Sequence, residues 1–234
     1  MVPRIRRLAV FDIDGTLTDT NAVDDECFTR AVADVLGLDP VALDWSMAPH
    51  VTDSGLLRWL AERHRGDPPT PVEADAVQRR FLELLRAELA ATPARFRPVP
   101  GAATVLRAVQ AAGWEVAIAT GGWEASARLK LMAIGLDPSA WALASASDAE
   151  TRAEILRLAV QRAMGGGTEP ARVVSIGDGV WDVRAAAALG WPFVGVASEV
   201  RADRLRIAGA STILPDLADV PALCAALDTA AVPP

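Results

Sequence analysis

One stretch of sequence decides the fold of this 234-residue chain: RLAVFDIDGT, residues 7–16. Its apolar run, residues 8–11, predicts a buried strand of a parallel sheet. The strand ends at Asp12 and Asp14, and Gly15 permits the tight turn that follows them. Open α/β sheets bind ligands at the carboxyl ends of their strands, and a buried carboxylate pair without a purpose is costly. The two aspartates are therefore predicted to be functional.

Beyond residue 100, helical and strand patterns alternate along the chain. Strands are predicted at 115–120, 141–145, 172–176, 192–197 and 211–214. Helices are predicted at 101–112, 123–134, 151–164, 180–189, 200–208 and 219–229. This alternation is typical of βαβ units. It predicts an α/β fold with a Rossmann-like, mostly parallel sheet and helices on both faces.

The region between the first strand and this alternating part shows helical patterns and no strand signal. Helices are predicted at 24–36, at 55–60 behind an N-cap of Thr52, Asp53 and Ser54, and at about 72–91. We therefore expect an α/β core domain and a separate all-helical domain. The expected boundaries are 1–20 with 98–234 for the core and 21–97 for the helices.

Two later strands end in further polar and glycine-rich motifs. The first is VAIATGG, residues 116–122, and the second is VVSIGDGVWD, residues 173–182; Arg152 opens a helical stretch between them. Taken in order with the DIDGT segment, these motifs resemble those of the haloacid dehalogenase superfamily, whose members are mostly phosphatases. The resemblance spans nearly the whole chain. It implies that residues 21–97 form a cap, with hinges at 18–21 and 98–101, which closes over the site and excludes water.

The resemblance also implies the catalytic roles of the first motif. Asp12 is the expected nucleophile, because a carboxylate can attack phosphorus and form an aspartyl-phosphate. Asp14 is the expected general acid and base, which protonates the leaving alkoxide and then deprotonates the attacking water. The dehalogenases of the superfamily lack an aspartate at this second position, so Asp14 favours phosphoryl chemistry.

The same resemblance implies a Mg²⁺ site, which suits the preference of this ion for oxygen ligands. Its expected ligands are the carboxylates of Asp12 and Asp178 and the backbone carbonyl of Asp14. Asp182 lies one helical turn beyond Asp178, on the same face. It would bind the metal, bind a metal-bound water or pair with Arg152.

Phosphate is expected at the second motif. The Thr120 hydroxyl and the backbone of Gly121 and Gly122 would supply uncharged donors close to the phosphate oxygens. Arg152 would hold the nucleophile and phosphate by charge-assisted hydrogen bonds, at a position where most relatives have lysine. The only lysine of this chain, Lys130, fits the middle of the helix predicted at 123–134.

The helical domain is expected to choose the substrate. The candidates for substrate contact are His50, Thr52 and Asp53, although Thr52 and Asp53 are equally well explained as an N-cap and a loop histidine is often solvated. The wider set of polar candidates comprises Asn21, Asp24, Asp25 and Arg58. The sequence does not decide whether three tryptophans belong to the core or to the wall of the pocket: Trp45, Trp59 and Trp123.

These residues predict a Mg²⁺-dependent phosphatase that hydrolyses a small phosphorylated metabolite through an aspartyl-phosphate. The alternative is a phosphomutase of the same family, similar to β-phosphoglucomutases, but no decisive Lys-His pair marks its cap. Phosphonate cleavage through a cap lysine is rejected because residues 17–100 contain no lysine. A phospho-acceptor receiver domain is disfavoured by the Asp-x-Asp spacing and by the cap.

Composition narrows the expected partners. A net charge of −7 argues against nucleic acid and against an acidic membrane surface. No run approaches 18 apolar residues, and the basic N-terminal residues lead directly into the first strand, so neither a membrane span nor a signal peptide is expected. A cytoplasmic monomer or homodimer is expected.

Overall fold

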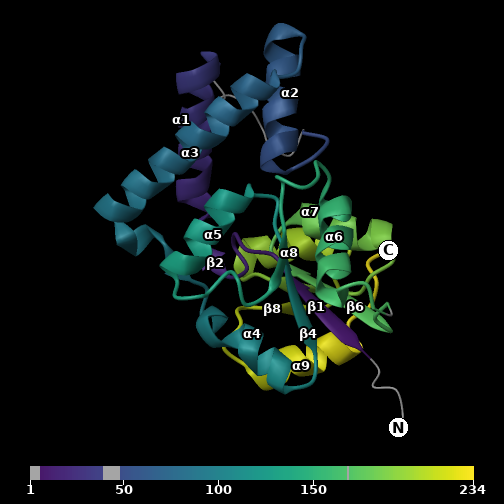
Figure 1. Ribbon diagram of the computed structural model, residues 1–234. Helices are drawn as coiled ribbons and strands as arrows, with labels where there is room; N and C mark the ends of the chain where they lie inside the picture. Colours follow the sequence, from purple (N-terminus) through teal and green to yellow (C-terminus); the bar gives the residue numbers. More distant parts are fainter. Residues whose placement is uncertain (1–5, 39–47, 168) are drawn as a thin grey trace.

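The computed structural model describes residues 6–38, 48–167 and 169–234 (Figure 1). Its centre is a six-stranded sheet in the order β5-β4-β1-β6-β7-β8, and every pair of neighbouring strands is parallel. The strands are β1 (Arg7–Phe11), β4 (Glu115–Ala119), β5 (Ala142–Ala144), β6 (Arg172–Gly177), β7 (Phe193–Val196) and β8 (Ile213–Leu214). The predicted strands are thus all present.

Side chains of β1 alternate between the two faces of the sheet, and each face is covered by helices. Ala9 and Phe11 belong to a buried cluster with α4 (Ala102–Ala111) and α9 (Val220–Thr229). Leu8 and Val10 belong to another cluster with α6 (Arg152–Met164) and α7 (Val180–Leu189). A further helix, α8 (Glu199–Ile207), packs against α7 and β7. The Rossmann-like α/β class is confirmed.

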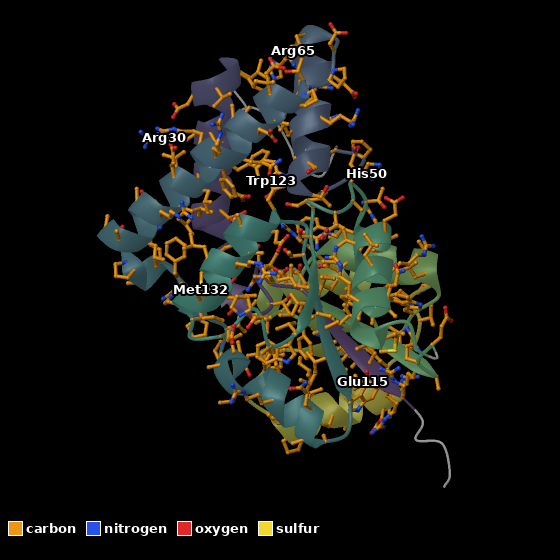
Figure 2. All side chains as sticks on the ribbon, viewed as in Figure 1. Arg30, His50, Arg65, Glu115, Trp123 and Met132 are labelled. Atoms are coloured by element: carbon orange, nitrogen blue, oxygen red, sulfur yellow. The ribbon has the colours of Figure 1, made fainter. Side chains whose placement is uncertain are left out.

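Three helices stand apart from the sheet, at the top of the view in Figure 1. They are α1 (Asn21–Leu36), α2 (Asp53–Arg65) and α3 (Pro71–Ala91). Phe28 of α1 and Phe81 of α3 pack on Trp123, with ring centroids 5.8 and 5.6 Å from that of the tryptophan. Trp123 immediately precedes α5 (Glu124–Ala133) of the α/β part and is 2% exposed (Figure 2). The Trp123 ring therefore packs the helical part against the α/β part. Trp45 lies outside the described residues.

A short antiparallel pair joins the two segments at which the chain enters and leaves the helical part. It consists of β2 (Thr18–Asp19) and β3 (Arg97–Pro98), which the sequence did not indicate. A two-residue strand has no periodicity to detect, and proline at its end cannot donate to a ladder. The two expected hinge segments consequently lie side by side.

The register of the sheet brings the motifs together. Phe11, the last residue of β1, is paired with Ile118 of β4 and Ile176 of β6. Since the three strands are parallel, the residues that follow them meet at one edge of the sheet. Among the described residues, none of the helices combines the length and apolar composition that a membrane span requires.

Candidate active site

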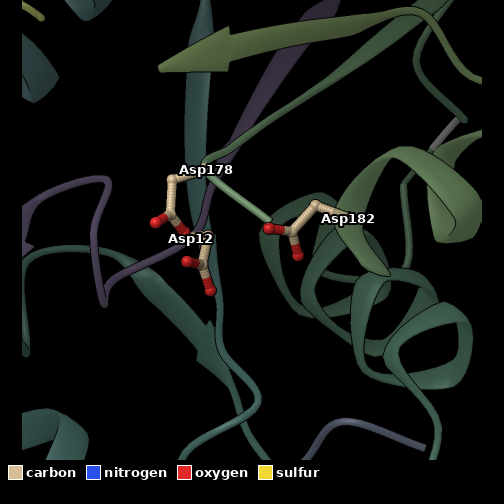
Figure 3. Close-up of side chains that lie close together, drawn as sticks. All are labelled: Asp12, Asp178 and Asp182. Carbon is tan, nitrogen blue, oxygen red and sulfur yellow. The ribbon is translucent and has the colours of Figure 1, made fainter. Parts of the chain in front are cut away.

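Three buried carboxylates face one another at this edge of the sheet (Figure 3). Asp12 follows β1, Asp178 follows β6, and Asp182 lies in the first turn of α7. Each offers an oxygen atom, and these oxygens lie within 4.8 Å of one another. A Cβ on Gly177 would lie 2.6 Å from the Asp182 carboxylate, so this close approach requires glycine.

The DIDGT turn is packed against the same cluster. Gly15 has a φ of +80°, which favours glycine, and a Cβ there would collide with the Asp178 carboxylate. Asn21, the first residue of α1, donates its side-chain amide to Asp178 Oδ2 at 3.2 Å. The helical part therefore begins within hydrogen-bonding distance of the carboxylate cluster.

Arg152 supplies positive charge to the cluster from the start of α6. Its Nη1 donates to Asp12 Oδ1 at 3.1 Å and to Asp182 Oδ1 at 2.7 Å. Its Nε donates to the Val51 carbonyl at 3.1 Å. The Asp182–Arg152 pair is one of the roles considered for Asp182 from the sequence. Asp182 Oδ2 also accepts the Gly179 backbone N–H at 3.0 Å, so both oxygens of this carboxylate have partners.

The cluster has more negative than positive charge. Burial, reinforced by Asp182, raises the pKa of Asp12 well above its ordinary value, although Arg152 opposes the change. Burial raises the pKa of Asp178 to about 7 and also raises that of Asp182. Asp178 Oδ1 is buried and has no hydrogen-bond partner among the residues that the structure describes. A hard divalent cation would neutralise these oxygens and give Oδ1 a partner, so the donor set fits Mg²⁺.

The Thr-Gly-Gly turn after β4 lies beside Arg152 and Asp14. The Gly122 backbone N–H donates to Thr120 Oγ1 at 3.0 Å, and Thr120 is buried. A Cβ on Gly121 would lie 2.6 Å from Arg152 Nη2, and one on Gly122 would lie 3.7 Å from Asp14 Oδ2. Glycine at 121 therefore leaves space for the Arg152 guanidinium, whereas a Cβ at 122 would make only an ordinary contact with Asp14.

Asp14 is bound by Lys130, for which the sequence predicted a place in a helix and no role. Lys130 of α5 is fully buried, and its Nζ lies 2.6 Å from Asp14 Oδ2 and 2.6 Å from Asp24 Oδ1. Thr20 Oγ1 donates to the other Asp14 oxygen at 2.6 Å. The available signal was compositional: Lys130 is the single lysine in a chain otherwise supplied with arginine.

A pocket of about 160 Å³ adjoins these groups between the α/β part and the helices. It is lined by Asp14, Asn21, Asp24, Asp25, Val51, Thr52, Asp53, Leu56, Gly121, Gly122, Arg152 and Trp181. Two of the three expected substrate contacts, Thr52 and Asp53, are in this lining. His50 is not; its Cβ lies close to Gly55, in the first turn of α2. Arg58 is also outside the lining and pairs with Glu150 at 2.9 Å.

Thr52 and Asp53 have structural partners as well as access to the pocket. The Thr52 side chain accepts the Gly55 N–H at 3.1 Å, which makes it the N-cap of α2. The Asp53 carboxylate instead accepts the Trp123 N–H at 2.8 Å, and the Asp53 N–H donates to the Gly121 carbonyl at 2.8 Å. Burial raises the pKa of Asp53 to about 7. These two hydrogen bonds of Asp53 therefore hold the start of α2 against the Thr-Gly-Gly turn.

The motifs and their arrangement agree with a comparison against known families. A family model described as "Hydrolase: haloacid dehalogenase-like hydrolase" matches residues 7–190, which include all four motif segments. The chain belongs to the haloacid dehalogenase-like hydrolases. It is a phosphatase of this family, that is, a phosphoric monoester hydrolase.

Relatives of this hydrolase cover most of its length. A phosphoglycolate phosphatase of Agrobacterium fabrum is 30% identical over 193 residues, 81% of this chain and 79% of the relative. Another, of Caulobacter vibrioides, is 28% identical over 234 residues, 96% of this chain and 93% of the relative. The solved structure of a putative β-phosphoglucomutase from Bacteroides vulgatus shares the fold, with a TM-score of 0.69 at 20% identity and coverage of 97% and 92%.

Proposed function

We propose that this hydrolase is a Mg²⁺-dependent phosphatase that transfers the phosphoryl group of a small metabolite to Asp12 and then to water. The observation that carries the proposal is the buried cluster of Asp12, Asp178 and Asp182 with the Arg152 guanidinium bound to two of its members. The proposed nucleophile and the hard oxygen ligands lie within 4.8 Å of one another, and the counter-charge of Arg152 is hydrogen-bonded to Asp12 and Asp182.

In the proposed first step, a carboxylate oxygen of Asp12 attacks phosphorus and the bond from phosphorus to the leaving oxygen breaks. Asp14 gives its proton to that oxygen, so the product leaves as an alcohol. Thr120 and the Gly121 and Gly122 backbone would hold the phosphoryl oxygens from the side of β4. Arg152 would keep the nucleophile oriented while contributing positive charge to the transition state.

In the second step, water attacks the phosphorus of the aspartyl-phosphate. Asp14, now a carboxylate, accepts a proton from this water. The bond between phosphorus and the Asp12 oxygen breaks, which regenerates the carboxylate and releases inorganic phosphate. When bound, Mg²⁺ would neutralise phosphoryl charge, held by Asp12, Asp178 and the Asp14 carbonyl, with Asp182 bound directly or through water.

Residues 21–97 are proposed to act as the cap of this enzyme. Asp53 and Asn21 reach the Thr-Gly-Gly turn and Asp178 from the helical part, so closure would complete the site from that side. The paired strands β2 and β3 would carry the hinge at 18–21 and 98–101. Closure would exclude water from the first step.

The pocket lining favours a leaving group that brings hydrogen-bond donors. It contains the carboxyl groups of Asp24, Asp25 and Asp53 beside that of Asp14, and buried Lys130 already pairs with Asp14 and Asp24. The one cation among the lining residues that the structure describes, Arg152, is already bound to two carboxylates. A polyol or amino alcohol phosphate suits this lining better than a substrate with a second carboxylate. The relatives are named phosphoglycolate phosphatases, so phosphoglycolate should be tested against these substrates. It is not taken as the substrate of this chain.

The alternative considered from the sequence, a phosphomutase, has support from the fold alone, since the solved structure named as a putative β-phosphoglucomutase is 20% identical to this chain. It must hold a second phosphate of its bisphosphate intermediate by contacts from the cap. The lining that the structure describes offers no lysine or histidine for this purpose. The phosphatase is therefore preferred.

The test is hydrolysis of 4-nitrophenyl phosphate and of a panel of phosphorylated metabolites, scored by kcat/KM. Activity should disappear on treatment with EDTA and return with Mg²⁺. Undiminished turnover in EDTA would remove the metal from the proposal. Isomerisation of a sugar phosphate without release of inorganic phosphate would select the phosphomutase.

A further inference from the structure

Lys130 lies beside the site and is fully buried. The proposed reaction gives this charged side chain no role. Burying an ammonium group is costly unless it is paired with negative charge. Its Nζ is bonded at 2.6 Å to Asp14, which follows β1, and at 2.6 Å to Asp24, which belongs to α1. One side chain of α5 therefore connects the expected acid and base with the first helix of the cap.

Lys130 remains charged in this position. Burial lowers its pKa, but the carboxylates of Asp14, Asp24 and Asp53 raise it, and the net effect is an increase above the ordinary value. The ammonium is a donor only, so it cannot take the proton that the reaction moves. With 0% exposure and two of its three N–H donors used, it is also poorly placed to bind substrate directly.

The geometry around Asp14 indicates what the lysine does. Thr20 donates to Asp14 Oδ1 and Lys130 to Asp14 Oδ2, so the carboxyl group is held at both oxygens. A Cβ on Gly122 would lie 3.6 Å from Lys130 Nζ and 3.7 Å from Asp14 Oδ2. The pair therefore lies against the turn that is proposed to hold the phosphoryl group. Two fixed oxygens leave little freedom of rotation for the carboxyl group.

We propose that Lys130 is a positioning residue: together with Thr20 it fixes the Asp14 carboxyl group in the orientation from which protons reach the leaving oxygen. This inference rests on the proposed phosphatase function. The proton moves from Asp14 to the leaving oxygen, and Lys130 neither gives nor accepts one. Its bond to Asp24 makes the orientation of Asp14 depend on the position of α1.

The test compares two substrates that differ in their need for a proton. An alkyl phosphate such as 2-hydroxyethyl phosphate needs protonation of its leaving oxygen, whereas 4-nitrophenyl phosphate leaves as a stable phenolate. The ratio kcat/KM reports events up to loss of the leaving group. Lys130→Met should lower kcat/KM about 100-fold for the alkyl phosphate, the scale of general acid catalysis, and only a few-fold for the aryl phosphate. Lys130→Arg should restore much of the alkyl phosphate activity.

A second variant protects the test against misfolding. Lys130→Met combined with Asp24→Asn removes one of the two carboxylates that would otherwise be left without a counter-charge. It should show the same substrate-dependent loss, and Thr20→Val should show it in weaker form. An equal loss on both substrates, in proportion to the folded fraction, would overturn the inference and leave Lys130 a structural residue. Wild-type protein that hydrolyses neither substrate would instead refute the proposed function.

Discussion

Replacing Asp178 with asparagine should abolish turnover and, without divalent ions, make the protein more stable. The Asp178 side chain is buried, and burial together with the Asp182 carboxylate raises its pKa from 3.8 to about 7. At about 1.4 kcal/mol per pH unit, this rise corresponds to roughly 4 kcal/mol against the ionised form. Asparagine has nearly the same shape and no charge, so the variant avoids this cost. It also removes a carboxylate that the proposed metal needs.

The size of the stabilisation depends on pH. The pKa of Asp178 is raised by folding, so its contribution to stability is fully present below pH 3.8. That contribution is lost as the pH rises towards 7, because the unfolded chain releases this proton before the folded protein does. The variant should therefore gain most at pH 8 and nothing near pH 4. At about 2–4 °C per kcal/mol for a chain of this size, the gain in Tm at pH 8 is roughly 8–16 °C.

The assay is thermal unfolding in EDTA at pH 8 and near pH 4, with Asp203→Asn as the matched control. Asp203 is 69% exposed, so its replacement should change stability by no more than about 0.5 kcal/mol. Added Mg²⁺ should stabilise the wild type by mass action and should stabilise the Asp178→Asn variant much less. A variant that is less stable than wild type at pH 8, or equally favoured at both pH values, would refute the reasoning.

Three further predictions concern the pocket. Among phosphoglycolate, 2-hydroxyethyl phosphate and phosphoethanolamine, which are similar in size, kcat/KM should be at least about tenfold lower for phosphoglycolate, the scale of one contact of ~1.4 kcal/mol; a preference for phosphoglycolate would contradict the charge argument. Asp53→Asn keeps an acceptor for the Trp123 N–H and removes a buried carboxyl group whose pKa is raised to about 7, so it should not lower Tm and should raise the relative kcat/KM for phosphoglycolate; a large loss of Tm with unchanged selectivity would make Asp53 purely structural. His50→Ala should change kcat/KM for every substrate by less than about twofold because His50 does not line the pocket, and a selective loss would instead place the imidazole near substrate.

The core of the fold could be predicted because its signals are local. The apolar run before Asp12 forms most of a strand of the sheet. After residue 100, strand patterns and helical patterns alternate along the chain, and each has its own hydrophobic periodicity. The family resemblance implied that Asp12 and Asp178 share a site, and the parallel strands explain why they meet, since the residues that follow such strands lie at one edge of the sheet. Asp12, Asp178 and Asp182 accordingly lie together.

Other features depend on contacts that no local pattern encodes. Lys130 and Asp14 are 116 positions apart, and helical periodicity gives the face of α5 but not what that face meets. Asp53 was read as part of a helix cap, but its carboxylate bonds to Trp123, 70 positions along the chain. The pairing of β2 with β3 involves two residues on each side, too few for alternation to be visible. These contacts are set by tertiary packing.

The central claim is that Asp12 carries the phosphoryl group, and the most direct measurement is to find that group. Wild-type protein is mixed with 4-nitrophenyl phosphate and Mg²⁺, quenched in acid within one turnover and reduced with borohydride, which converts an aspartyl-phosphate to homoserine. Peptide mass spectrometry should then locate homoserine at position 12, in wild type and not in the Asp12→Asn variant, which should also lack turnover. Homoserine at another aspartate, or wild-type turnover by Asp12→Asn, would contradict the account.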